Sequence, residues 1–80
     1  DAVLRSFVRD GRIVVIPAAK GKRRILLEYL VTAFQPGVRF PETVVNEKLN
    51  AWHDDHAALR RYLVNEGLMH RADGVYWRVD

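Results

Sequence analysis

The spacing of hydrophobic residues changes along the chain and predicts a series of short elements. The apolar positions within residues 3–8 lie on one face of a short helix, which Gly11 can end by adopting a left-handed conformation. Residues 12–16 form a β-branched run closed by Pro17, which predicts a short buried strand. The first nineteen residues are therefore expected to be a helix and a strand that precede the main body.

Residues 25–34 are hydrophobic around most of the circumference of a helix, and only Arg24, Glu28 and Thr32 mark a polar side. A helix with so little polar surface packs against neighbours on several sides. We therefore expect this segment to be the central helix. The sequence Gln35-Pro36-Gly37 predicts its end.

A strand and two further helices are predicted next. Residues 38–40 are long enough for a short strand, and Pro41 takes the position of a first helical residue. After a turn of about three residues, Asp54 or Asp55 is a good N-cap for the last helix, and Gly67 ends it. The residues expected to point inward are Val44, Val45 and Leu49 in the first of these helices and Leu59, Tyr62 and Leu63 in the second.

The end of the chain predicts a β-hairpin. Residues 68–71 and 75–79 flank Ala72-Asp73-Gly74, and the alternation of the last strand places Val75, Trp77 and Val79 toward the core. From residue 22 the order is helix, strand, helix, turn, helix and hairpin, which is the order of a winged helix. We therefore predict an α+β, winged-helix-like fold. Its three-helix core and C-terminal wing span residues 20–80, and residues 1–19 form an N-terminal extension.

Size and composition narrow the class of protein. Eighty residues are enough for one domain with a modest core. The chain has no cysteine, which fits a reducing compartment, and its longest apolar run, residues 13–19, is too short to span a membrane. We expect a cytoplasmic location without membrane contact. Because the chain does not begin with Met, it can be a fragment of a longer regulator.

Positive charge is concentrated in the first half of the chain. Residues 1–40 carry eight Lys or Arg and three acids, whereas residues 41–80 carry five and seven, so the half charges are +5 and −2. Basic character favours an anionic partner such as nucleic acid. The asymmetry limits this inference, because the last predicted helix lies in the acidic half.

The segment Trp52-His53-Asp54-Asp55-His56 contains the residue types of a metal site. Two adjacent aspartates at a helix start do not converge with both imidazoles on one ion, as a tetrahedral site requires. Capping explains both the position and the type of the aspartates, because a carboxylate there accepts the first free N–H groups of the helix. We therefore expect a cap, no metal and no cofactor. No catalytic serine motif or phosphate-binding loop is present, so no enzyme activity is expected.

Three groups of residues are candidates for nucleic-acid contacts. With Leu59 inward, Ala57 and Arg61 lie on the outer face of the last helix and Arg60 lies at its edge, where a recognition helix meets DNA. The alternative is that Arg60 or Arg61 pairs with Glu42, Glu47 or Glu66 as an ordinary ion pair. Further candidates are Lys20, Lys22, Arg23 and Arg24 before the central helix, and His70, Arg71 and Arg78 on the hairpin.

The cations of residues 20–24 lie at the start of a helix, where they oppose the helix dipole. An anionic partner would compensate for this cost. The alternative is a solvated basic turn that aids solubility.

This succession of motifs resembles a known bacterial family over nearly the whole chain. The motifs are Phe7, Asp10-Gly11-Arg12, Ile16-Pro17, Lys22-Arg23, Leu26, Leu30, Phe34, Phe40-Pro41-Glu42, Val45-Asn46, Leu49, His53, Asp55, Ala58-Leu59-Arg60-Arg61, Leu63-Val64, Gly67-Leu68-Met69, Arg71, Gly74 and Tyr76-Trp77-Arg78. The family they resemble is called domain of unknown function 2087, whose members occur alone or behind a helix-turn-helix domain in proteins regarded as transcriptional regulators. The resemblance implies a regulatory context and no particular site. Pro41 departs from the capping residue that the family pattern leads us to expect.

Two functions follow as expectations. The first is a non-catalytic module of a bacterial transcriptional regulator that binds double-stranded DNA through the candidate cations. The second is an interaction or dimerisation module of the same shape that does not bind DNA, with a second copy or another domain of the regulator as its partner. Support for the second comes from the negative charge of the C-terminal half and from the apolar residues Val64, Tyr76 and Trp77.

Overall fold

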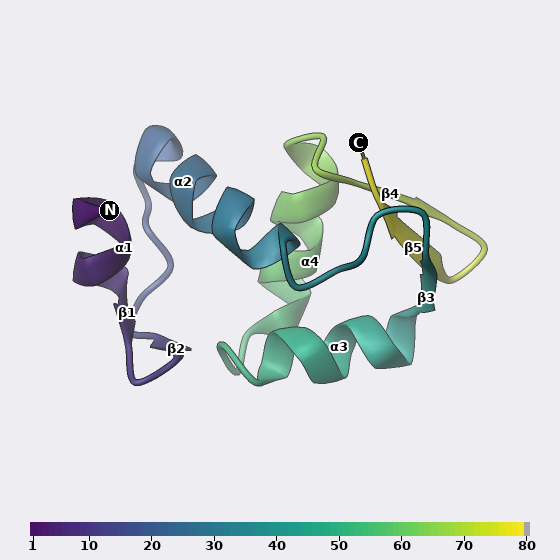
Figure 1. Ribbon diagram of the computed structural model, residues 1–80, viewed down its shortest axis with the longest axis horizontal. Helices are drawn as coiled ribbons and strands as arrows, with labels where there is room; N and C mark the ends of the chain where they lie inside the picture. The colour runs from purple at the N-terminus through teal and green to yellow at the C-terminus, as the bar shows by residue number, and fades with distance from the viewer. Residues whose placement is uncertain (80) are drawn as a thin grey trace.

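The computed structural model describes residues 1–79, which form helices and short antiparallel strands (Figure 1). In chain order the elements are α1 (Ala2–Phe7), β1 (Val8–Arg9), β2 (Arg12–Ile13), α2 (Lys20–Val31), β3 (Arg39–Pro41), α3 (Glu42–Asn50), α4 (His56–Asn65), β4 (Met69–Ala72) and β5 (Val75–Arg78). The strands make two sheets, one with order β1-β2 and one with order β3-β5-β4. The prediction of an α+β fold is confirmed at this level.

The elements are arranged along the long axis of a molecule that measures 34 × 21 × 19 Å. Figure 1 shows α1 and the β1–β2 hairpin at one end and the three-stranded sheet at the other, with α2, α3 and α4 between them. No helix among residues 1–79 has the length and hydrophobicity needed to cross a membrane.

The central position predicted for the apolar helix is confirmed. Leu26, Leu27 and Leu30 of α2 are fully buried, as is Phe34 just beyond its end, and they pack in one core with side chains from α3, α4 and the sheet. The helix starts at Lys20, so the cations of residues 20–24 form its first turn. Tyr29 and Ala33 are exceptions among the apolar residues 25–34, since both are exposed, Tyr29 by 41%.

The N-terminal extension differs from its prediction. Asp10 and Gly11 have φ values of 51° and 75° and form the turn of the β1–β2 hairpin, so Gly11 does not end α1. Asp-Gly with both residues at positive φ is the preferred two-residue hairpin turn. The helix ends instead at Phe7. The predicted strand 12–16 is also wrong in extent, because it stops at Ile13, and Val14 and Val15 are 56% and 54% exposed.

Arg12 and the backbone of Ile13 fasten this hairpin to the α3–α4 turn, and the Ile13 N–H donates to the Trp52 carbonyl at 2.8 Å. The guanidinium of Arg12 donates to the carbonyls of Asn50 and Ala51 at 3.1 and 3.2 Å and to the Asp54 carboxylate at 2.9 Å. It thereby binds the carbonyls at the C-terminus of α3, which have no partner within the helix. The turn itself covers residues 51–55 and is longer than the three residues expected.

The C-terminal hairpin forms as predicted, but its inner face was assigned wrongly. Asp73 and Gly74 form a two-residue turn with φ values of 53° and 75°, and Arg71 lies opposite Tyr76. Tyr76 is only 1% exposed and lies in the core, whereas Val75, Trp77 and Val79 are half-buried. The hydroxyl of Tyr76 donates to Glu42 at 2.8 Å, which removes the cost of burying a polar tip.

The start of α3 also departs slightly from its prediction. Pro41 pairs with Val75 as the last residue of β3 and occupies the N-cap position, so the first helical residue is Glu42. Val45 and Leu49 point into the core as expected.

Candidate nucleic-acid interface

The two aspartates at the start of α4 have different roles. The Asp55 carboxylate accepts a hydrogen bond from the Ala58 N–H at 3.2 Å, and the Asp55 N–H donates to His53 Nδ1 at 2.9 Å. The predicted cap is therefore confirmed for Asp55. Asp54 is the partner of Arg12 and points to the N-terminal hairpin. Within residues 1–79 no group of three or more His, Asp or Glu side chains is arranged to hold a metal ion.

The outer side of α4 carries the candidate residues Ala57, Arg60 and Arg61 in different environments. Ala57 is half-buried, and Arg60 is bonded to the Asn46 side chain and lies 3.6 Å from the Glu42 carboxylate. The structure thus shows the alternative weighed for Arg60, an ion pair with Glu42. Arg61 is exposed and takes part in no ion pair among residues 1–79.

A notch between α4 and the hairpin brings three arginines together. Its volume is about 70 Å³, and the residues that line it are Arg60, Arg61, Val64, Asn65, Arg71 and Tyr76. Arg71 comes from β4 and lies over the Tyr76 ring, with its guanidinium carbon 5.6 Å from the ring centroid. Sequence spacing could not pair Arg71 with the arginines of α4, because the approach depends on which hairpin face turns inward.

The hydroxyl of Tyr76 at the base of this notch is held in its neutral form. Burial raises the pKa of Tyr76 above its ordinary value, and the hydrogen bond to Glu42 raises it further. The positive charge of Arg60 acts in the opposite direction. Glu42 therefore interacts with both the tyrosine and the arginine, which fixes the inner wall of the notch.

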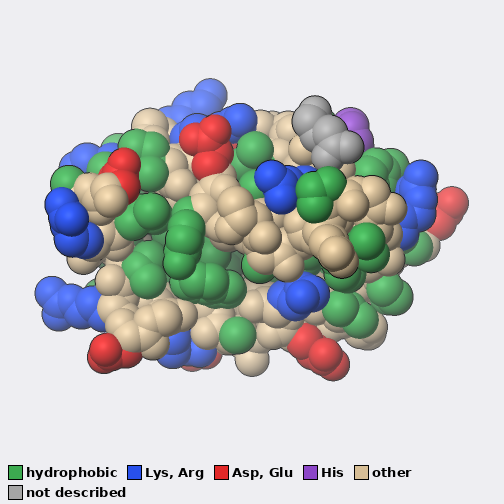
Figure 2. Space-filling view, viewed as in Figure 1, with side chains coloured by type: hydrophobic (Ala, Val, Ile, Leu, Met, Phe, Trp, Pro, Cys, Tyr) green, Lys and Arg blue, Asp and Glu red, His purple; other side chains and the backbone are tan. Residues whose placement is uncertain are grey.

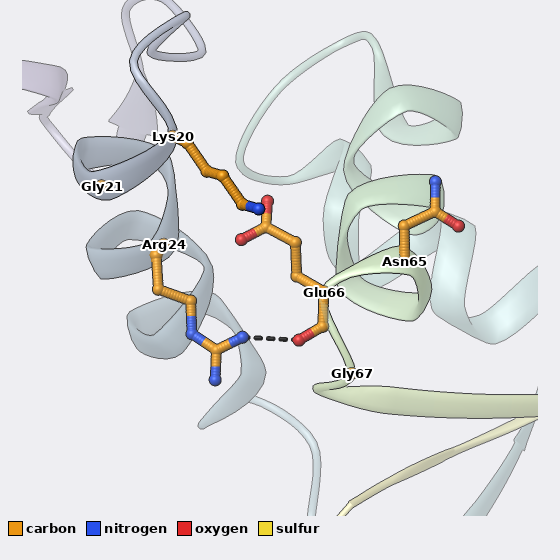
Figure 3. A pocket seen from close by; sticks show the side chains of 6 residues that line it. All are labelled: Lys20, Gly21, Arg24, Asn65, Glu66 and Gly67. Atoms are coloured by element: carbon orange, nitrogen blue, oxygen red, sulfur yellow. Dashed lines mark hydrogen bonds between the residues drawn. The ribbon is translucent and has the colours of Figure 1, made fainter.

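The cations at the start of α2 turn mostly inward onto the end of α4. Arg23 donates to the Glu66 carboxylate at 3.0 Å and lies over the Tyr62 ring, 4.4 Å from its centroid, and Arg24 donates to the Glu66 carbonyl. Figure 3 shows Arg24 bonded in this way across the gap between the helices, and it shows Lys20 pointing toward the Glu66 carboxylate. The sequence left open an anionic partner or a solvated basic turn, and the structure instead pairs Arg23 and Arg24 with Glu66 of the chain itself.

This arrangement also supplies positive charge and a hydrogen-bond donor to the C-terminus of α4. The C-terminus of α4 carries partial negative charge on its free carbonyls, and the N-terminus of α2 brings cations to it. The groove between them has a volume of about 640 Å³ and is lined by Lys20, Gly21, Arg24, Asn65, Glu66 and Gly67. Lys20 and Lys22 remain exposed, and neither forms an ion pair among residues 1–79.

The hairpin candidates lie on two different faces. Arg71 and Arg78 share the face of Met69 and Tyr76, and Arg78 is half-buried and donates to the Phe34 carbonyl at 3.4 Å. His70 lies on the opposite face beside Trp77. Of the two hairpin arginines, Arg71 is the more exposed.

Residues 12–78 match the family described as "Uncharacterized protein conserved in bacteria (DUF2087)". The chain belongs to this family. The DUF2087 match confirms the resemblance and extends from β2 to β5, so it includes all ten candidate residues and leaves out α1 and β1. No curated protein and no solved structure matches the chain.

Proposed function

We propose that this DUF2087 domain is a non-catalytic module of a bacterial transcriptional regulator and that it binds the phosphate backbone of duplex DNA at the notch between α4 and β4. The observation that carries the proposal is the convergence of Arg60, Arg61 and Arg71 from two elements. Arginine recognises phosphate through a planar fork of donors, and two exposed arginines in one notch can hold adjacent phosphate oxygens.

The order of the elements supports a winged-helix interpretation. The helices α2, α3 and α4 precede a β-hairpin, and the strand between α2 and α3 pairs with the last strand of that hairpin. In such an arrangement α4 corresponds to the recognition helix and β4–β5 to the wing. The notch lies where these two elements meet, so a DNA backbone lying against both would pass over it.

The candidates differ in how free they are to contact phosphate. Arg61 and Arg71 are exposed and form no ion pair among the described residues, so we assign them the main contacts. The charge of Arg60 is partly neutralised by the Glu42 carboxylate, so Arg60 attracts a phosphate over a shorter distance. Lys20 and Lys22 can add phosphate contacts at the edge of the interface. A ligand can reach Arg23, Arg24 and Arg78 only by displacing their partners within the chain. Ala57 can contact only a base edge.

Fluorescence anisotropy of a labelled DNA duplex tests this function. We expect binding at micromolar concentration that weakens as salt is raised, because phosphate contacts release counterions. Replacing Arg61 by Ala should weaken binding, whereas the charge-matched variant Arg9→Ala, on the N-terminal hairpin, should bind like the wild type. Absence of salt-dependent binding, or equal losses in the two variants, contradicts the proposal.

A second candidate function, a protein interaction module, is favoured by a different observation. Val14, Val15 and Tyr29 are large hydrophobic residues with more than two fifths of their surface exposed. Figure 2 shows hydrophobic side chains gathered in the part of the molecule where α1 and α2 lie. Sedimentation equilibrium tests self-association at this surface: a dimer that dissociates in Val14→Ser/Val15→Ser supports it, and a strict monomer at high concentration contradicts it.

A further inference from the structure

The outer face of the three-stranded sheet carries an aromatic and basic row that the notch does not use. Arg39, Trp77 and His70 lie opposite one another on β3, β5 and β4. The guanidinium carbon of Arg39 is 4.0 Å from the centroid of the Trp77 ring, and the His70 ring is 5.7 Å from it. The Arg39 guanidinium thus lies over the Trp77 ring and the tilted His70 ring lies beside it, and we call these three side chains the ledge.

This ledge is separate from the notch. Successive residues of a strand point to opposite faces of a sheet. Tyr76 and Arg71 lie on the face turned to α4, so Trp77 and His70 lie on the face turned away. Arg39 and His70 are exposed and Trp77 is half-buried.

The chemistry of this face favours a ligand with flat rings and negative charge. Among the paired positions of β3, β5 and β4 within residues 1–79, the side chains of this face are Arg39, Pro41, His70, Ala72, Val75 and Trp77, none of which is a carboxylate. Beside Trp77 lies a hollow of about 130 Å³ that is bordered by Gly37, Arg39 and Arg78. A ligand there meets the Trp77 ring and the Arg39 guanidinium, whereas the Arg78 guanidinium donates to the Phe34 carbonyl.

We propose that this ledge binds unpaired nucleobases of single-stranded nucleic acid. A base can stack on the outer side of the Arg39 guanidinium, or on the Trp77 ring in place of Arg39, and the adjoining phosphate can pair with Arg39. In a duplex the flat faces of the bases are covered by their neighbours, so the ledge selects single strands or frayed ends. This site is independent of the duplex contact at the notch.

Anisotropy of a labelled oligothymidylate, compared with an abasic strand of the same length, tests the stacking directly. Both strands carry the same phosphates, so only base stacking separates their affinities. We expect tighter binding of the oligothymidylate and a loss of roughly fivefold or more in Trp77→Leu, since stacking is worth at least about 1 kcal/mol per base. Tyr29→Leu, which removes an exposed aromatic ring elsewhere, should bind like the wild type.

Two further variants keep the test decisive. Arg39→Gln alters an exposed side chain and should also weaken binding, so the result stands even if Trp77→Leu folds poorly by circular dichroism. In Trp52→Phe the only tryptophan left is Trp77, and its fluorescence should be quenched saturably by oligothymidylate. Equal affinity for the abasic strand, or no effect of Arg39→Gln, overturns the proposal.

The two sites can fail separately. Arg61→Ala should weaken duplex binding and leave oligothymidylate binding unchanged, and Trp77→Leu should do the reverse. If Trp77→Leu and Arg39→Gln abolish self-association in sedimentation without affecting oligothymidylate binding, the face is a protein contact and the proposal is wrong.

Discussion

The two basic regions of the molecule differ in how many of their cations are bound within the fold. Residues 20–24 contain four cations, and Arg23 and Arg24 are bound to Glu66 at the end of α4. The notch between α4 and β4 contains fewer cations, yet Arg61 and Arg71 form no ion pair among residues 1–79. The density of positive charge along a chain therefore does not measure how much of it is available to a ligand.

The difference arises from where the acidic residues lie. Glu66 follows α4 directly and faces the first turn of α2, so it neutralises the richest basic segment and ties two helices together. Glu42 lies at the start of α3 and reaches only Arg60 and Tyr76. Substitutions at these acidic residues and their neighbours can therefore separate the cations that stabilise the fold from those that can bind a partner.

The largest effect is expected at Glu66. In Glu66→Ala the half-buried Arg23 loses its carboxylate, and breaking such a pair should cost about 3 kcal/mol of unfolding free energy. Urea denaturation measures this. The control is Glu28→Ala, which breaks an exposed pair with Arg24 and should cost less than about 1 kcal/mol. Similar costs for the two variants would show that residues 20–24 are not anchored by Glu66.

A substitution at Tyr76 tests how the inner wall of the notch is stabilised. Tyr76→Phe removes a hydrogen bond to a carboxylate and should destabilise the domain by about 1.5 kcal/mol near neutral pH.

The pH dependence of stability should also change in this variant. Because the folded pKa of Tyr76 is raised, the native state keeps its proton longer than the unfolded state does. Its contribution is fully present below the ordinary tyrosine pKa, near 10, and is lost as pH rises through the folded pKa. Thermal unfolding of wild type and Tyr76→Phe across alkaline pH measures this. A decline of equal steepness in both proteins would contradict the assigned role.

A smaller effect is expected at the start of α4. Asp55→Ala removes the N-cap acceptor and should cost about 1 kcal/mol. The neighbouring Asp54→Ala breaks an exposed pair with Arg12 and should cost less. Urea denaturation of the two variants tells them apart, and a larger loss at Asp54 would mean that the Arg12 contact outweighs the cap.

Adding a metal ion tests the role of the same turn in a second way. If Asp54, Asp55 and the histidines only shape the turn, zinc should not shift the melting temperature at pH 7. A saturable rise that disappears in both His53→Ala and His56→Ala would instead identify them as ligands, because a ligand of the native state stabilises it by mass action.

Local patterns predicted the central helix, the order of elements from α2 onward and a cap at Asp54 or Asp55, of which Asp55 is the residue that caps α4. These features depend on periodicity or on residues a few positions apart. The Asp10-Gly11 turn was missed because a glycine after an apolar helical stripe is also typical of a helix end. The inner face of β5 was misassigned because Tyr76 has a distant hydrogen-bond acceptor, Glu42, that hydropathy does not reveal.

The candidate site was predictable only as a set of cations. The ion pair of Arg60 with Glu42 was one of the alternatives weighed from the sequence, and the structure contains it. The partner of Arg23 lies 43 positions away, and nothing local points to it. Long-range pairing therefore decides which cations remain available.

The most direct test of the account is the salt dependence of duplex binding in two charge-matched double variants. Arg61→Ala/Arg71→Ala removes the two arginines assigned to phosphate, and Arg5→Ala/Arg9→Ala removes two exposed arginines of the N-terminal extension. The slope of log Kobs against log salt should fall by about two units in the first variant and stay unchanged in the second, because each lost phosphate contact removes roughly one unit. Equal slopes in both variants and the wild type would contradict the account.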